Sequence, residues 1–126
     1  MKNWLLAVAA VGEALTGLVL LVYPPVVIKL LFGTDIAGIG ELTSRFAGIA
    51  LIALSVACWP YAALRSLYGM LTYSVLVTLY LLWIALTGEW IGLLLWPAIL
   101  LHAVLTLLLA RDSFKSREDE TVVKAR

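Results

Sequence analysis

Two side chains that can carry a proton interrupt the apolar stretches of this 126-residue chain. Glu13 lies near the middle of the first stretch and His102 near the middle of the last. A carboxylate at bilayer depth costs about 3 kcal/mol on insertion scales, so it normally faces protein or a cavity and has a partner. A buried Glu–His pair can bind a ligand or carry protons, because burial can bring the titration of both groups near neutral pH. It can equally be a hydrogen bond that satisfies two costly groups and fixes the register of the helices.

Helical spacing predicts which side chains share a face with these two groups. Glu13 lies on a stripe of small residues, which permits close approach of another helix, and His102 lies on a similar stripe. Tyr73 and Tyr80 are seven residues apart, so they point the same way from the third apolar stretch. We therefore expect contact between Glu13 and His102, with Tyr73 or Tyr80 close by, as a ligand-binding or structural polar core.

Depth in the membrane favours His102 over Arg45 as the partner of Glu13. At the rise of an α-helix, Glu13 and His102 lie about 13 Å and 12 Å from the same end of their stretches, whereas Arg45 lies about 21 Å up. Arg45 instead follows Glu41 by one helical turn, which predicts an ion pair at the outer interface. Recognition of a lipid headgroup or an acidic ligand by Arg45 is the alternative.

The composition excludes several classes of protein. Hydrophobic residues make up 63% of the chain and charged residues 13%, too few to cover a water-soluble core. A net charge of +1 without a basic patch gives no sign of nucleic-acid binding. The single Cys58 excludes an intrachain disulfide, and no spacing of Cys and His predicts a metal site. No nucleophile–base pair or phosphate loop is visible, so we expect neither an enzyme nor a cofactor.

Four apolar stretches are long enough to cross a bilayer, since about 20 residues of helix span its hydrocarbon core. Pro24-Pro25 ends the first of them, and Pro97 predicts a local kink in the last. The expected fold is therefore an all-α bundle of four transmembrane helices. The expected spans are residues 4–23, 42–59, 67–86 and 91–110.

A short helix is expected between the first two spans. Residues 26–32 are too few to cross and carry Lys29 in an apolar run, with Gly33 placed to stop a helix. This pattern is typical of a helix that lies in the membrane interface. Residues 1–110 then form one membrane domain, and residues 111–126 form a charged cytoplasmic tail.

The distribution of Lys and Arg predicts the orientation. Only Lys29 and Arg45 fall on one side of the membrane, and the other basic residues fall on the opposite side. Basic residues favour the cytoplasmic side, so both termini are expected in the cytoplasm. The basic residues on that side are Lys2, Arg65, Arg111, Lys115, Arg117, Lys124 and Arg126.

Several motifs resemble those of four-helix bacterial inner-membrane proteins of the DoxX-like kind. The resemblance covers most of the chain and implies a four-helix bundle in the bacterial inner membrane. Proteins of that group are linked to quinone-coupled redox complexes and accessory roles, and no catalytic residue is carried over. The motifs are LLFG at Leu30–Gly33, Gly38-x-Gly40, RFAGIAL from Arg45, GMLTY at Gly69–Tyr73 and LWPA from Leu95, with His102-Ala103 after it.

The chain is also similar to small multidrug transporters in its length, its four spans and the placement of Gly12-Glu13-Ala14. It lacks the Gly- and Trp-bearing pattern of their third span, and Pro24-Pro25 departs from them.

Two function classes follow from these patterns. The first is a non-enzymatic membrane protein, either an accessory subunit or a module that binds a lipid or quinone beside Glu13 and His102. The alternative is a small proton-coupled transporter that uses Glu13. The expected partners are membrane lipid and a larger membrane complex or further copies of the chain.

Overall fold

The protein consists of five helices with no strand in the part of the chain that its computed structural model describes, residues 3–59 and 63–125. Four of the helices are long and apolar enough to cross a membrane. The expected all-α fold of four long helices and one short helix is confirmed, and the chain is a multi-pass integral membrane protein. The helices are α1 (Asn3–Val22), α2 (Pro24–Phe32), α3 (Ile39–Ala57), α4 (Ala63–Thr87) and α5 (Leu95–Lys124).

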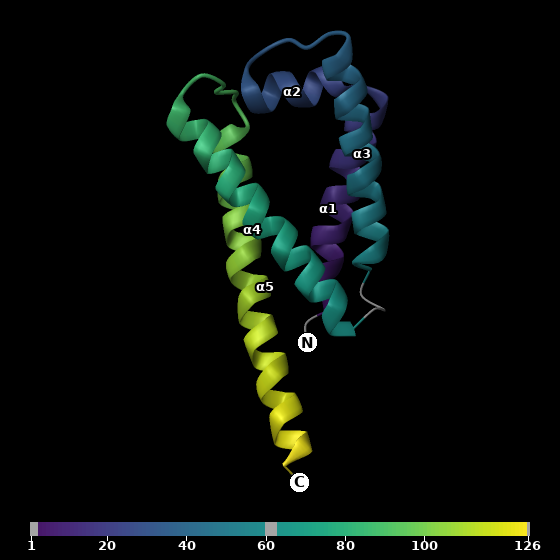
Figure 1. Cartoon of the computed structure of the whole chain (residues 1–126), viewed down its shortest axis with the longest axis vertical. Helices are drawn as coiled ribbons and strands as arrows, with labels where there is room; N and C mark the ends of the chain where they lie inside the picture. The colour runs from purple at the N-terminus through teal and green to yellow at the C-terminus, as the bar shows by residue number, and fades with distance from the viewer. Residues whose placement is uncertain (1–2, 60–62, 126) are drawn as a thin grey trace.

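The long helices form two antiparallel pairs (Figure 1). α1 packs along α3, and α4 packs along α5. The two pairs meet near the start of α1, where a buried apolar cluster joins α1, α4 and α5. They diverge toward the opposite end, where α2 lies across the bundle. The buried cluster consists of Leu5, Leu6, Ala9, Ala10, Cys58, Leu67, Met70, Leu105 and Leu109.

Two glycines allow the closest approach between α1 and α3. A Cβ atom on Gly17 would lie 2.7 Å from the carbonyl oxygen of Gly48, and one on Gly48 would lie 2.6 Å from that of Gly17. Helices in a membrane gain little from the hydrophobic effect on association, so their contact depends on close van der Waals packing. The two glycines therefore fix the distance between α1 and α3.

The loop before α5 holds α2 in place. The backbone N–H groups of Gly92 and Leu94 donate to the carbonyls of Leu31 (2.9 Å) and Leu30 (2.7 Å), at the end of α2. These last carbonyls of a helix lack intrahelical partners and need others inside a membrane. Gly33 ends α2 in the left-handed conformation (φ 70°), as expected for the predicted stop. A Cβ atom on Gly92 would collide with the backbone of α2.

The boundaries of the last helix differ from the expected ones. α5 begins at Leu95 rather than at residue 91, because the preceding residues pair with α2. Pro97 consequently lies in the first turn, where its missing N–H would have no intrahelical partner, and the predicted kink is wrong.

The tail expected from residue 111 continues α5 to Lys124. Arg117 connects this extension to α4, because its Nε–H donates a hydrogen bond of 2.9 Å to the hydroxyl of Tyr68. The guanidinium also lies 5.7 Å from the centre of that ring. The second span also shifts, with α3 running over Ile39–Ala57 instead of residues 42–59.

The close contact between α1 and α3 predicts opposite effects for two glycines of one helix. Gly17→Ala should lower the free energy of unfolding by about 1–3 kcal/mol, because its Cβ would press on the backbone of Gly48. Gly12→Ala is the matched control, since nothing lies within 4 Å of a Cβ there. It should change stability by less than about 1 kcal/mol, in the stabilising direction. Unfolding in mixed detergent micelles measures both, and equal effects would contradict the close approach.

Candidate functional site

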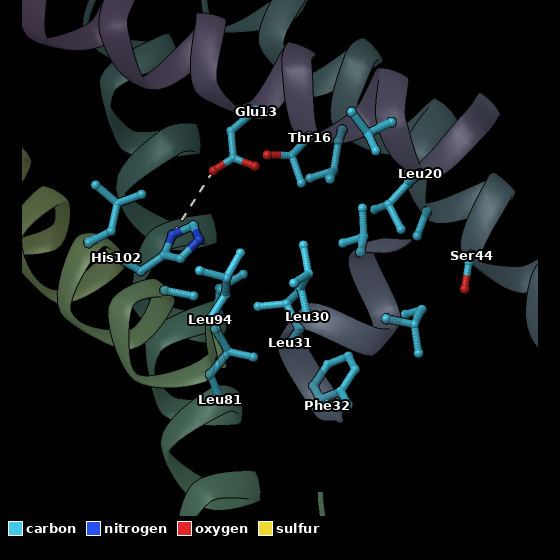
Figure 2. Close-up of a pocket in the computed structure, with 18 of the residues that line it drawn as sticks. Glu13, Thr16, Leu20, Leu30, Leu31, Phe32, Ser44, Leu81, Leu94 and His102 are labelled. Atoms are coloured by element: carbon cyan, nitrogen blue, oxygen red, sulfur yellow. Dashed lines mark ion pairs between the residues drawn. The ribbon is translucent and has the colours of Figure 1, made fainter. Parts of the chain in front are cut away.

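A cavity of about 760 Å³ lies between the two helix pairs and α2, and Figure 2 shows side chains that line it. All five helices contribute to its lining, which is mostly aliphatic. This volume is in the range of sites that bind small molecules, about 300–1,000 Å³. The polar side chains among its lining residues are Glu13, Thr16, Ser44, Tyr73 and His102.

Three of these side chains form a polar cluster. The hydroxyl of Tyr73 on α4 donates a hydrogen bond of 2.9 Å to Oε2 of Glu13 on α1. Nδ1 of His102 on α5 lies 4.0 Å from the other carboxylate oxygen, Oε1. The rings of Tyr73 and His102 meet edge to face, with their centres 6.0 Å apart. The cluster therefore connects three transmembrane helices at one wall of the cavity.

The cluster is deeply buried. Only 8% of the Glu13 side chain and 14% of the His102 side chain are exposed. Nδ1 of His102 has no hydrogen-bond partner among the residues that the structure describes, because 4.0 Å is too long for a hydrogen bond. The imidazole and the carboxyl group thus interact through space, whereas the Tyr73–Glu13 contact is a direct hydrogen bond.

Small residues allow the cluster to form. Ala9 and Ala10 lie one turn before Glu13 and are almost completely buried. Without larger side chains there, α4 and α5 can approach α1 closely enough for Tyr73 and His102 to reach its carboxyl group. The stripe of small residues next to Glu13 is the sequence feature that predicted this close packing.

The cavity opens at the apolar surface of the bundle. Leu15 of α1 and Leu101 of α5 both line the cavity, and both are 60% exposed. They lie well inside membrane-crossing helices, so this opening faces the hydrocarbon region of the bilayer. A lipid-soluble molecule can reach the cavity there without entering water.

Of the two tyrosines expected near Glu13 and His102, Tyr73 belongs to the cluster and Tyr80 does not. Tyr80 is 60% exposed and stacks on Trp83, with ring centres 6.0 Å apart. The cavity side of α4 follows Tyr73, Val77 and Leu81, at intervals of four residues. Residues four apart drift slowly around a helix, so the cavity-facing position reaches Leu81, and the neighbouring Tyr80 points away from the cavity.

The expected ion pair between Glu41 and Arg45 is not formed. In the described chain, the ion pair near this end of the bundle joins Lys29 and Asp35, with Nζ and Oδ1 3.1 Å apart. Arg45 is exposed and Glu41 is half-buried, and the two side chains do not meet. Spacing within one helix identified the wrong pair, because Lys29 and Asp35 are brought together by the turn after α2.

Sequence reasoning did not identify the contribution of α2 to the site. Residues 26–28 and 30–32 line the cavity, and Figure 2 shows Leu30, Leu31 and Phe32 opposite Glu13 and Thr16. The apolar run of this helix predicted an interfacial position, which does not require contact with a cavity. One feature of the sequence could have shown this contribution. The run of residues 26–32 is apolar on more than the one face that an interfacial helix needs to bury.

The cluster offers acceptors and donors for a ligand but no set of metal ligands. In the described parts of the chain, no three His, Cys, Asp or Glu side chains gather closely enough to hold a metal ion. The hydroxyl of Thr16 donates to the Gly12 carbonyl of its own helix, so it is already engaged. Glu13 and His102 are the ionisable groups through which this cavity can recognise a polar atom, and the hydroxyl of Ser44 is a further polar group in its lining.

The cluster predicts different effects for the same change at two tyrosines of α4. Tyr73→Phe removes the hydroxyl that donates to Glu13 and should cost about 0.6–1.7 kcal/mol of unfolding free energy, the range for hydrogen bonds between membrane helices. Tyr80→Phe keeps the ring that stacks on Trp83 and should be nearly silent. Unfolding in mixed micelles measures both variants. A silent Tyr73→Phe would show that the hydrogen bond does not stabilise the bundle.

Comparison with protein-family models finds no match, and neither a curated protein nor a solved structure is found to be similar to the chain. The likeness to DoxX-like proteins and to small multidrug transporters therefore stays a prediction from the sequence.

Proposed function

We propose that this chain is a non-enzymatic protein of the bacterial inner membrane that binds a lipid or a quinone in the cavity beside Glu13 and His102. It acts as a binding module or as an accessory subunit of a larger membrane complex. The observation that carries the proposal is the cavity itself, which has aliphatic walls and a polar cluster at one wall.

The shape of the site matches a molecule that is apolar along its length and polar at one end. Residues of α2, α3 and α5 supply a wall of Leu, Ile, Val, Ala and Phe side chains. Binding sites of this kind use apolar contacts for affinity and a few polar groups for orientation. Glu13 and His102 are positioned to orient the polar end.

The opening at Leu15 and Leu101 supports a ligand that arrives from the bilayer. A lipid or quinone dissolved in the membrane is already concentrated at that depth. α2 covers the end of the cavity away from the chain termini, which limits access from the water on that side.

The placement of the helix ends supports cytoplasmic termini. α1 begins and α5 ends at the same end of the bundle (Figure 1), as an even number of membrane crossings requires. Arg65, Arg111, Lys115 and Lys124 lie near that end of their helices. Positive residues favour the cytoplasmic side, and this supports cytoplasmic termini as part of the proposal.

Filling the cavity from α3 tests the proposal without touching the polar cluster. Ala47 lines the cavity, so Ala47→Phe should lower the amount of lipid or quinone retained by the protein about tenfold, the effect of roughly 1.4 kcal/mol of lost binding energy. Native mass spectrometry from mild detergent reports retained ligands and partner subunits together. Ala53→Phe is the matched control, because Ala53 is exposed on the same helix and does not line the cavity. Equal retention by the two variants would refute binding in this cavity.

A further inference from the structure

His102 presents two different nitrogens to its surroundings. Nδ1 is completely buried and faces Oε1 of Glu13 at 4.0 Å. The other ring nitrogen, Nε2, lies on the side of the ring that faces the cavity (Figure 2). No hydrogen bond to Nε2 is formed within the described part of the chain, and unlike Nδ1 it is not sealed off from a ligand. The imidazole is thus placed between the carboxyl group and the cavity.

The carboxyl group determines which nitrogen carries the proton. Tyr73 already donates to Oε2, so Oε1 is the oxygen left for His102. A proton on Nδ1 is attracted by this oxygen, whereas a lone pair on Nδ1 would be repelled by it. The Glu13 oxygen thus favours the tautomer with the proton on Nδ1 through its charge, since 4.0 Å is too long for a hydrogen bond. With the proton on Nδ1, Nε2 carries a lone pair on the cavity side of the ring and can accept a hydrogen bond.

The remaining lining excludes several headgroups. No Lys or Arg is among the residues that line the cavity, so a phosphate would have no cation to pair with and would be repelled by Glu13. An ether or ester oxygen has no proton to donate to Nε2. An ammonium group would lose its hydration among aliphatic walls, where the Glu13 carboxyl already has Tyr73 and His102 as partners.

We propose that the cavity selects a neutral amphiphile with a hydroxyl headgroup, and that this hydroxyl donates a hydrogen bond to Nε2 of His102. The class includes long-chain alcohols and phenols with an apolar tail. This inference rests on the proposed function and narrows its ligand. The aliphatic walls hold the tail, and Nε2 of His102 accepts the hydrogen bond of the hydroxyl. An oxidised quinone has only acceptor oxygens and falls outside the class, whereas its hydroquinone, a phenol, falls within it. His102 is the specificity-determining residue, with Glu13 as the residue that positions its tautomer.

A matched set of ligands tests the headgroup. Native mass spectrometry of the full-length chain in mild detergent is used to titrate 1-hexadecanol, its methyl ether, hexadecylamine and hexadecyl phosphate. The alcohol should bind about 3- to 20-fold more tightly than the ether, the value of one hydrogen bond between buried groups in a membrane. Tighter binding of the amine or the phosphate, or equal binding of alcohol and ether, would overturn the inference. Comparing the affinity of 1-hexadecanol with that of a phenol carrying the same tail distinguishes the two members of the class. Both should bind more tightly than the ether.

Variants assign the preference to His102. His102→Phe keeps a ring but removes the acceptor, so alcohol and ether should bind it equally. Ala47→Phe should weaken both ligands alike, because it narrows the cavity without touching the headgroup site. If His102→Phe still prefers the alcohol, the inference fails while the proposed function stands. If none of these ligands binds the wild-type chain, the inference fails, and the proposed function is decided separately by the lipid or quinone that the wild type and Ala47→Phe retain.

The tautomer can be measured without any substitution, because His102 is the only histidine of the chain. Nitrogen NMR of the isotopically labelled protein should show the proton on Nδ1 and an unprotonated Nε2. Adding 1-hexadecanol should shift the Nε2 resonance, and adding the methyl ether should not. A proton on Nε2 in the ligand-free protein would contradict the inference directly.

Discussion

A carboxyl group inside a membrane has to be satisfied by the protein itself, and the arrangement of this bundle depends on how that is done. Glu13 receives the hydroxyl of Tyr73 and faces the imidazole of His102, so one residue of α1 engages both α4 and α5. Each such contact is worth only about 1 kcal/mol. The apolar cluster next to it, which includes Leu67 and Met70, also packs these helices against one another. The polar contacts instead select one register among those that apolar packing would allow, since a shifted helix would leave Glu13 without partners.

The cavity follows from how the two helix pairs are held. Gly17 and Gly48 bring α1 and α3 into backbone contact, and a second buried cluster around Leu95 packs α4 against α5. Each pair is thus tightly packed within itself. Because the pairs join at the end where α1 begins and diverge toward α2, space remains between them beneath α2. The polar cluster lines one side of this space. An apolar cavity with a polar wall is therefore a consequence of the packing, and it gives the protein its capacity to bind an amphiphile.

Much of the fold could be predicted from the sequence, because length, hydropathy and Pro24-Pro25 constrain membrane helices strongly. Helical periodicity also placed Glu13, His102 and a tyrosine on faces that the structure brings together. Periodicity could not choose between Tyr73 and Tyr80, because that choice depends on how α4 crosses its neighbours. Nor could it show that α2 covers a cavity, since the hydrogen bonds that fix α2 come from a loop some sixty residues later in the chain. The start of α5 depends on the same contact, which is why hydropathy alone predicts a start at residue 91 instead of Leu95.

The most direct test of this account is a double-mutant cycle between α1 and α5. Glu13→Ala, His102→Ala and the double variant are unfolded in mixed micelles, and their free energies of unfolding are compared with that of the wild type. The account predicts a coupling energy of about 0.5–1.7 kcal/mol, because each single variant leaves the other group buried with fewer partners. Additive effects would show that the carboxyl group and the imidazole do not interact, and the polar cluster would then not set the register of the bundle.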